Sequence, residues 1–322
     1  MATAWRHLGT IASLATPVAL PVERLEARLH GSNVPITMIH AGAPGTADFV
    51  AGALFTVEQR ISVGRLKTPL ELRSTPFGKL SAGADLEVIE VPALWRCCLP
   101  ASAELRMPAW VSLEIGGGND SAIALPSELR KEVSRHCRRE AYEVQLSTEI
   151  GDVRRFYAEL YRPYVTTRFR AGVVLVDEDR FLAVSRGMTL AILRANSEWV
   201  AGLLFRQRGK TLHLGWFGSP TAPPRAGASE VLDVWVIERA AAQGASRVVM
   251  GHSRPSLADG VLRYKRRFGA VVRSTRFPQR VIGLSIRRRT PALVETLNAA
   301  RFVNFRHGQA QVYESKPDFQ DD

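Results

Sequence analysis

The first part of the chain alternates short apolar runs with breaks rich in Gly and Pro. Runs with β-branched or alternating apolar residues each predict a strand, and they occupy residues 34–40, 60–66, 70–73, 86–91 and 109–115. Residues 22–30 and 93–99 are helix candidates. Gly116-Gly-Gly-Asn-Asp120 makes a flexible break. We take this break as a domain boundary, with no catalytic motif before it.

A helix is predicted directly after the break, over residues 127–142. Ser127 suits its N-cap, and Leu129, Val133 and Cys137 recur every four residues. The other face is basic and is either a solvated surface or an anion-binding one, and it carries Lys131, Arg135, Arg138 and Arg139.

The remaining pattern predicts a mixed sheet with helices between its strands. Strand 142–147 and helix 152–161 lead to a three-stranded meander with hairpin-length turns, at residues 189–194, 199–206 and 211–217. A helix over 228–243, capped by Ser229 and stopped by Gly244, precedes strand 246–250 and helix 257–268. Strands 271–276 and 280–287 are expected to close the sheet, before a helix at 291–302 and a frayed tail past Gly308.

Composition indicates an ordinary globular protein of 322 residues, 46% hydrophobic and with a mean hydropathy of −0.06. No apolar run reaches the roughly 18–20 residues of a membrane span. Polar residues and Pro17 interrupt the N-terminal apolar run, which argues against a signal peptide. The three cysteines, two of them adjacent, fit a reduced cytoplasmic chain. CxxC and HExxH spacings are absent, so we expect no metal.

The net charge of +12 lies entirely in the second part of the chain. Residues 1–124 carry ten Lys or Arg against eleven Asp or Glu, whereas residues 125–322 carry thirty-three against twenty. A basic part of this kind favours an anionic partner such as a nucleotide, a nucleic acid or an anionic surface. Arg outnumbers Lys thirty-seven to six, so a compositional bias is the alternative explanation.

Residues 251–270 form the most informative segment, because a polar turn and a basic helix follow the apolar strand 247–250. Its Ser253-Arg254-Pro255 and Tyr264-Lys-Arg-Arg-Phe-Gly-Ala270 resemble the characteristic stretch of the FemAB-like branch of the GNAT acetyltransferase fold. That branch includes peptidoglycan-bridge aminoacyl transferases and acetyltransferases associated with cellulose biosynthesis. Residues 125–131 and 152–157 are similar to its linker and to the first helix of its second lobe, so the resemblance covers roughly residues 125–290.

The resemblance implies an α/β (α+β) fold with a mixed sheet flanked by helices, in two tandem lobes. Residues 1–124 would be a degenerate or β-rich first lobe, 125–142 a linker helix, 143–308 the acyltransferase lobe and 309–322 a frayed tail. The coenzyme A loop of the classical family would fall at residues 223–228, where Arg225 and Gly227 are the expected cofactor-binding residues. Their spacing departs from the family pattern, which puts coenzyme A binding in doubt.

Amide formation from a thioester or aminoacyl ester needs a neutral amine and a stabilised oxyanion, and it needs no dedicated nucleophile. His252 is a candidate general base, or a turn histidine bonded to the backbone. Ser253 is a candidate oxyanion donor or a turn residue. Arg254, in the same motif, is a candidate substrate-binding residue.

Two helix residues are further catalytic candidates in the resemblance. Tyr264 would protonate a leaving group, unless it is a core residue. Lys265 would neutralise a phosphate or a developing negative charge, unless it is a surface lysine.

The acceptor pocket is expected to involve residues outside the motif. Arg168 and Arg170 lie in the loop that caps this pocket in the fold, where a guanidinium clamps a carboxylate or phosphate. Trp216 would lie beside the acyl group, or else in the core.

These residues lead to the hypothesis of an N-acyltransferase that moves an acyl group from acyl-CoA, or another carrier, to a small-molecule amine. An aminoacyl-tRNA-dependent amide ligase is the first alternative, since the basic part would attract a nucleic acid backbone. A catalytically inactive scaffold or binding protein is the second.

Overall fold

The computed structural model describes residues 19–67, 71–72, 75–117, 123–169, 175–220, 225, 227–275 and 280–315. The chain forms two compact units. Unit 1 comprises Met1–Val111, His252–Arg263 and Arg273–Asp322, and unit 2 comprises Ser112–Gly251 and Tyr264–Val272. Both units are therefore built from segments that are discontinuous in sequence.

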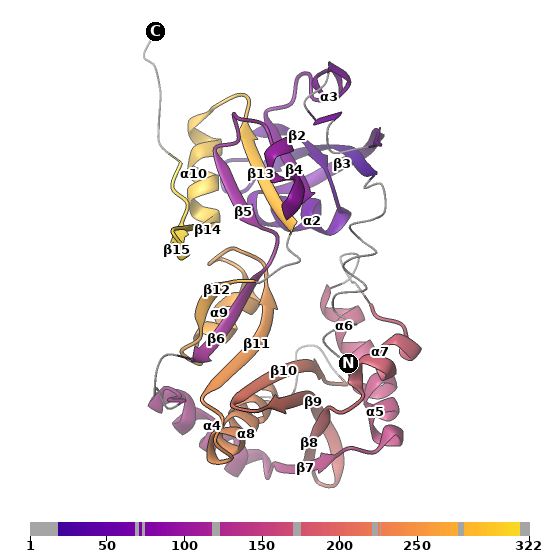
Figure 1. The fold of residues 1–322 in the computed structure, drawn as a ribbon, viewed down its shortest axis with the longest axis vertical. Helices are drawn as coiled ribbons and strands as arrows, with labels where there is room; N and C mark the ends of the chain where they lie inside the picture. Colours follow the sequence, from indigo (N-terminus) through magenta and orange to yellow (C-terminus); the bar gives the residue numbers. More distant parts are fainter. Residues whose placement is uncertain are drawn as a thin grey trace. The chain divides into compact units, whose positions relative to one another are not determined.

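Unit 1 contains a six-stranded sheet in the order β3-β1-β2-β4-β13-β5 (Figure 1). Strands β2 and β4 pair in parallel, and the other neighbours are antiparallel. The strands are β1 (Leu20–Leu29), β2 (Pro35–Ala41), β3 (Phe55–Leu66), β4 (Leu86–Pro92), β5 (Leu105–Pro108) and β13 (Arg280–Ile286). The other elements are α2 (Pro44–Leu54), α3 (Thr75–Leu80), the 3₁₀ helix η2 (Ala93–Cys98), α10 (Pro291–Ala300) and the hairpin of β14 (Val303–Arg306) and β15 (Gln309–Val312).

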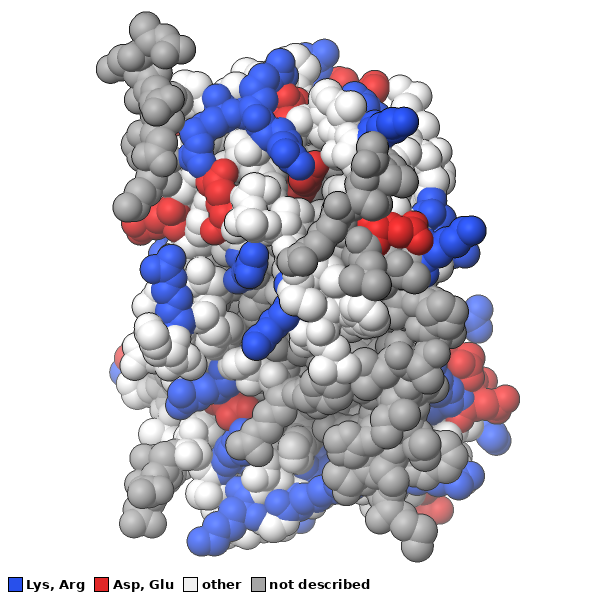
Figure 2. Space-filling view, turned by 45° about the horizontal axis from the view of Figure 1, so that its top comes forward, with Lys and Arg blue, Asp and Glu red and all other residues white. Residues whose placement is uncertain are grey.

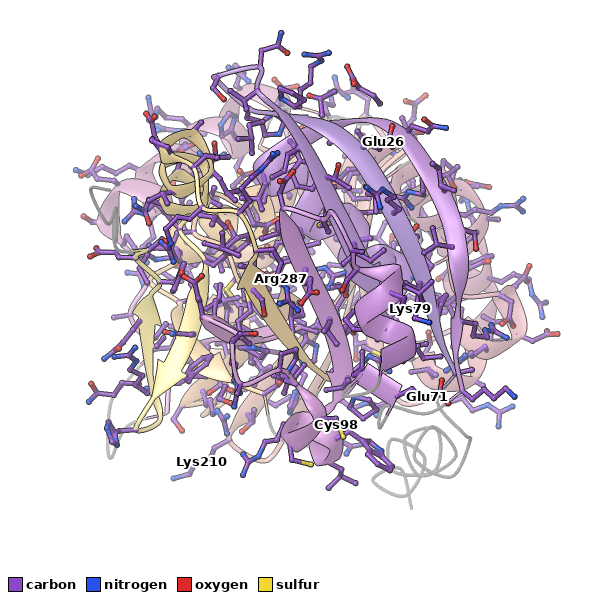
Figure 3. All side chains as sticks on the ribbon, turned by 90° about the horizontal axis from the view of Figure 1, so that it is seen from above. Glu26, Glu71, Lys79, Cys98, Lys210 and Arg287 are labelled. Atoms are coloured by element: carbon purple, nitrogen blue, oxygen red, sulfur yellow. The ribbon has the colours of Figure 1, made fainter. Side chains whose placement is uncertain are left out.

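Strand β4 is buried along its whole length because both faces of the sheet are covered. Val88 packs in an apolar cluster with residues of α2 and α10. Ile89 points the other way and packs with Phe77 and Leu99. Two carboxylates interrupt this apolar strand, and each meets an arginine: Glu87 pairs with Arg287 at 2.8 Å, and Glu90 pairs with Arg280 at 2.6 Å. Figure 3 labels Arg287 beside β13.

Two expectations and one omission in this part of the chain differ from the structure. Residues 71–72, within the strand expected at 70–73, form a 3₁₀ turn. Residues 20–29 form a strand rather than a helix, since Leu25, Ala27 and Leu29 are buried at alternate positions. Helix α2 was missed. It begins at Pro44 with Ala43 as its N-cap, so the capping side chain that usually marks a helix start is lacking.

The predicted lobe 143–308 also differs from the observed division. Strand β13 lies between β4 and β5, in the sheet of unit 1, rather than closing the second sheet. Its Ile282 and Leu284 are fully buried in the core of unit 1. Residues 309–312, expected to be frayed, form β15, and residues 316–322 lie outside the described part.

Unit 2 contains most of a seven-stranded sheet in the order β12-β6-β11-β10-β9-β8-β7 (Figure 1). The strands are β6 (Val111–Gly116), β7 (Glu143–Ser147), β8 (Thr189–Ala195), β9 (Glu198–Arg208), β10 (Thr211–Gly218), β11 (Arg247–Ser253) and β12 (Val271–Ser274). The helices are α4 (Ser127–Glu140), α5 (Ile150–Phe156), the π-helical turn η3 (Tyr157–Tyr161), α6 (Arg162–Phe169), α7 (Glu178–Ser185), α8 (Ala228–Ala242) and α9 (Gly260–Arg266).

The predicted mixed α/β class, with helices flanking mixed sheets, is confirmed. Strands β7 to β10 form the expected antiparallel series, and β10 and β11 pair in parallel across helix α8. None of the described helices is long and apolar enough to cross a membrane.

Candidate functional site

Strands β10 and β11 are paired over only part of their lengths. Their parallel register joins Thr211–His213 to Arg247–Val249, although β10 continues to Gly218 and β11 continues beyond Met250. The pairing of β10 with β9 also shifts between Leu214 and Phe217. Carboxyl ends of parallel strands that separate in this way are a usual place for a ligand.

The end of β10 is fixed against the π-helical turn η3. A Cβ on Gly218 would lie 2.6 Å from the backbone N of Tyr161, so only glycine fits there. The Ser219 N–H donates to the Leu160 carbonyl at 3.1 Å. A π turn leaves a helix carbonyl outside the regular hydrogen-bond series, and such turns recur at functional sites.

Ser219 itself is fully buried, and its hydroxyl has no hydrogen-bond partner among the described residues. A buried polar group without a partner is destabilising, so it requires an explanation beyond folding. Ser219 was not among the predicted site residues.

Asp233 is a buried charged residue of α8, the helix that connects β10 to β11. It lies on α8 within the apolar run Val231-Leu-Asp-Val-Trp-Val-Ile237 and is buried. The Tyr264 hydroxyl donates to its Oδ2 at 2.7 Å. Burial raises the pKa of Asp233 from 3.8 to about 7, against the opposing effects of the Tyr264 hydrogen bond and of the Lys265 charge.

Sequence reasoning missed Asp233, although a signal was present. Seven consecutive residues cover every face of a helix, so a single carboxylate in an otherwise apolar run of this length is expected to be buried. A buried carboxylate with a pKa near neutrality is suited to general acid–base catalysis.

The Tyr264 hydroxyl lies near the first turn of α8, where the charge of Glu230 contributes to raising its pKa. In that turn the Ser229 Oγ donates to Glu230 Oε2 at 2.8 Å. Burial, followed by the charge of Asp233, raises the pKa of Tyr264 well above its ordinary value. Tyr264 therefore stays protonated near neutral pH and is a hydrogen-bond donor to Asp233.

The structure brings Lys265 to the same region. Its Nζ lies 3.9 Å from the position that a Cβ on Gly251 would occupy, and Gly251 adopts a φ of +75° at the end of the unit 2 part of β11. The ammonium also lowers the pKa of Asp233. Tyr264 and Lys265 were both predicted as site residues, and they lie together with Asp233.

Arg168 lies on α6, where it contacts Tyr164. The charges of Asp233 and Glu230 in turn affect the pKa of Tyr164. The Arg168 guanidinium stacks 5.4 Å from the Tyr164 ring centroid and donates to the phenol oxygen. Burial raises the pKa of Tyr164, the charge and hydrogen bond of Arg168 oppose this, and the charges of Asp233 and Glu230 add to the rise. Arg170 lies outside the described residues.

Trp216 lies in an aromatic cluster rather than alone on a surface. Its ring centroid is 4.8 Å from that of Phe181 and 6.4 Å from that of Tyr161, and the side chain is partly buried. This geometry fits core packing and leaves one part of the indole accessible.

The two predicted cofactor-binding residues lie at the N-terminus of α8. Arg225 forms an ion pair with Glu140 at 3.3 Å. Gly227 packs against α4, where a Cβ would come within 2.4 Å of His136 Cγ. Glu230 adds a carboxylate to the first turn of α8, which opposes phosphate binding at that terminus.

The remaining three predicted residues belong to unit 1. Arg254 is held by unit 1 itself, since it donates to the carbonyls of Gly45 and Ala109 and lies over the Trp110 ring at 4.0 Å. His252 is exposed. Ser253 is buried, and its Oγ has no hydrogen-bond partner among the described residues.

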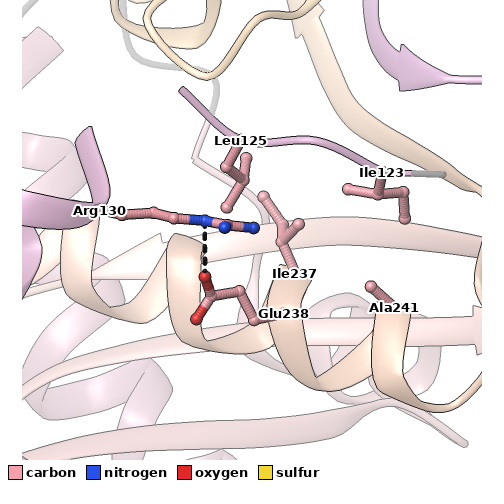
Figure 4. Close-up of a pocket in the computed structure, with 6 residues that line it drawn as sticks. All are labelled: Ile123, Leu125, Arg130, Ile237, Glu238 and Ala241. Carbon is pink, nitrogen blue, oxygen red and sulfur yellow. Dashed lines mark ion pairs between the residues drawn. The ribbon is translucent and has the colours of Figure 1, made fainter. Parts of the chain in front are cut away.

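Two further features of the structure do not add to the site. Figure 2 shows basic side chains spread over one face with acidic side chains between them, and the basic face of α4 includes the pairs Lys131–Glu128 and Arg139–Glu140. A cavity of about 230 Å³ between α4 and α8 is crossed by the Arg130–Glu238 ion pair of 3.0 Å (Figure 4). Ligand cavities are typically larger, about 300–1,000 Å³. The described residues contain no cluster of metal ligands.

No protein-family model matches this sequence, and no curated protein matches it. Among solved structures, the chain is similar to L-PGS from Bacillus licheniformis, at 12% identity over 86% of this chain and 90% of that one, with a TM-score of 0.41. It is similar to FemX at 11% identity over 81% and 88% of the two chains, with a TM-score of 0.41. It is also similar to a putative GNAT-family acetyltransferase from Novosphingobium aromaticivorans, at 15% identity over 68% and 82%, with a TM-score of 0.34.

Proposed function

We propose that unit 2 is an N-acyltransferase in which Asp233 acts as the general base toward an amine. The observation that carries this proposal is the buried Asp233 carboxylate, held by Tyr264 at 2.7 Å close to Lys265. A carboxylate that titrates near pH 7 is well matched to removing a proton from an ammonium group.

The reaction follows from this arrangement and needs no covalent enzyme intermediate. Asp233 takes one proton from the ammonium group, and the neutral nitrogen attacks the acyl carbonyl. The N–C bond forms and the C–S or C–O bond to the carrier breaks, while the second proton leaves with the thiol or alcohol. Lys265 is placed to offset negative charge that develops on the carbonyl oxygen.

The acyl donor is a thioester of coenzyme A or of another carrier. The alternative donor is an aminoacyl-tRNA, and two observations favour it. Arg225 is already paired with Glu140, and Glu230 opposes a phosphate at the start of α8. The basic excess of residues 125–322 would attract a nucleic acid backbone.

A transfer assay tests the proposal and separates the donors. Purified protein is incubated with acetyl-CoA or with mixed aminoacyl-tRNA and a panel of amines, and acylated products are identified by mass spectrometry. We expect product from one donor class, and a loss of at least roughly 100-fold in kcat/KM for Asp233→Asn. Asp179→Asn, an exposed carboxylate in the first turn of α7, is the matched control and should retain full activity.

Absence of product from both donors, with no thermal stabilisation by either, would contradict the proposal. That result would favour the remaining hypothesis, an inactive scaffold or binding protein.

A further inference from the structure

The two oxygens of the Asp233 carboxylate have different surroundings. The Tyr264 hydroxyl donates to Oδ2 at 2.7 Å. Among the residues that the structure describes, no other hydrogen bond reaches this carboxylate. Asp233 keeps 8% of its surface exposed, so its burial does not close it off completely. The oxygen that remains for a substrate is therefore Oδ1.

The Tyr264 ring is itself held in place by packing. Its centroid lies 5.2 Å from that of Phe268, which is fully buried. Tyr264 is on α9 and Asp233 is on α8, so the hydrogen bond joins two helices. A functional side chain keeps its orientation when a neighbour of this kind is fixed by its own packing. The contact therefore sets the plane of the carboxylate, and with it the direction of Oδ1.

The same hydrogen bond makes Tyr264 a poor proton donor to a leaving group. Its proton is directed at Asp233 at 2.7 Å. Burial, followed by the charge of Asp233, raises the pKa of the phenol well above its ordinary value. A general acid works best when its pKa lies near the working pH. The geometry favours another role for this residue.

We propose that Tyr264 is a positioning residue, which holds Oδ2 of Asp233 so that Oδ1 accepts the proton of the substrate amine. This inference rests on the proposed function. One N–H bond of the ammonium group breaks, an O–H bond forms at Oδ1, and the electron pair left on nitrogen attacks the acyl carbonyl. The Tyr264 proton stays on its own oxygen throughout the reaction.

Tyr264 also affects the pH at which Asp233 acts as a base. Burial raises the pKa of Asp233 to about 7, and the Tyr264 hydrogen bond opposes this rise because it favours the ionised carboxylate. Tyr264→Phe removes this bond and keeps the ring. It leaves in place the other titratable and charged groups around Asp233, which are Glu230 on α8, Lys265 on α9, and Tyr164 with Arg168 on α6.

The pH profile of kcat/KM for the amine tests the proposal. In Tyr264→Phe the pKa of Asp233 rises, so we expect the ascending limb of the profile to move up by about one to two pH units. Above this limb, kcat should remain at least roughly tenfold below that of the wild type, since the carboxylate is no longer oriented. A leaving-group acid would instead alter the descending limb and leave the ascending limb where it is.

Tyr313→Phe is the matched control. The Tyr313 hydroxyl also donates to a carboxylate, that of Glu104 at 3.4 Å, and both residues belong to unit 1. This variant should keep the wild-type kcat and pH profile. An unshifted ascending limb in Tyr264→Phe, or an equal shift in Tyr313→Phe, would overturn the proposal.

A second measurement needs no substrate and separates this inference from the proposed function. Folded Asp233 keeps a proton that the unfolded chain has lost, so the free energy of unfolding falls as the pH rises toward the folded-state pKa. In Tyr264→Phe this pKa is higher, and the fall measured in urea should continue at least about one pH unit beyond that of the wild type. The difference should disappear when both proteins carry Asp233→Asn.

The two measurements fail independently. Unfolding curves that level off at the same pH in wild type and Tyr264→Phe would contradict the positioning role even if acyl transfer is observed. A fall that extends to higher pH in Tyr264→Phe would show that Tyr264 controls Asp233 even if no acyl donor gives a product.

Discussion

At the scale of single residues, Asp233 links the chemistry of the site to the stability of the fold. Its pKa of about 7 in the folded protein lies above the 3.8 of an unperturbed carboxyl, because the side chain is buried. Between these values the folded protein keeps a proton that the unfolded chain has lost. The free energy of unfolding therefore decreases by up to roughly 4 kcal/mol as the pH rises from about 4 to about 7. Below and above this range the contribution of Asp233 no longer changes with pH.

Asp233→Asn should remove this slope. The free energy of unfolding in urea, measured from pH 4 to pH 8, is expected to fall less with pH in Asp233→Asn than in the wild type. The exposed control Asp179→Asn should follow the wild-type curve. Parallel curves for wild type and Asp233→Asn would show that Asp233 has an ordinary pKa.

Ser219 gives a prediction of the opposite kind, in which truncation does not destabilise the protein. Its hydroxyl is buried without a partner in the described residues, so Ser219→Ala removes a polar group that gains nothing from folding. We expect an unchanged or higher Tm, and a free energy of unfolding that rises by at most about 1–3 kcal/mol. Ser185→Ala, which breaks an existing hydrogen bond, should lower the Tm. A clear loss of stability in Ser219→Ala would indicate a hydrogen-bond partner for this hydroxyl.

At the scale of elements, the docking of β10 on the π turn η3 depends on Gly218. In Gly218→Ala the new methyl group would meet the Tyr161 backbone at 2.6 Å, and backbone cannot rotate away as a side chain does. We expect a loss of about 1–3 kcal/mol in the free energy of unfolding. Gly151→Ala in α5, which has open space around its Cβ, should be neutral or gain up to about 1 kcal/mol. Equal stability of the two variants in urea would contradict this account of the contact.

The elements that the sequence predicted well are those whose signals are local. The meander β8-β9-β10 has short apolar strands joined by short turns, and α4 has an apolar residue every four positions. Helix α2 lacks a capping side chain, and β1 was taken for a helix despite its alternating burial. For the candidate site, the motif directed attention to Tyr264 and Lys265, which stay predictions, whereas the neighbouring Asp233 was not predicted because its burial depends on packing between elements far apart in sequence. Ser219 carries no sequence signal at all, since only its burial distinguishes it from other serines.

At the scale of the whole molecule, no local pattern could place β13. Its sequence fits any antiparallel sheet, and only its neighbours β4 and β5, which pair with it across separations such as Ile286 to Leu86 and Val281 to Pro108, identify it as part of unit 1. The predicted boundary near residue 120 coincides with the Gly-rich break at residues 116–120. It does not divide the chain into two independent folding units, because both units contain segments from either side of it. Long-range pairing of this kind is decided by the burial of Ile282 and Leu284 rather than by propensity.

This topology predicts how fragments of the chain behave. Residues 1–124 alone lack β13 and α10, so β4 and β5 lose the strand between them, and the core face that α10 covers is exposed. We expect this fragment to show no cooperative thermal unfolding by circular dichroism. Co-expression with residues 125–322 should restore a complex that unfolds cooperatively, because the missing strand is supplied in trans. The control is a co-expressed second fragment carrying Leu284→Asp, which places a charge in the core and should abolish recovery. Cooperative unfolding of residues 1–124 by themselves would show that the first part is an autonomous lobe after all.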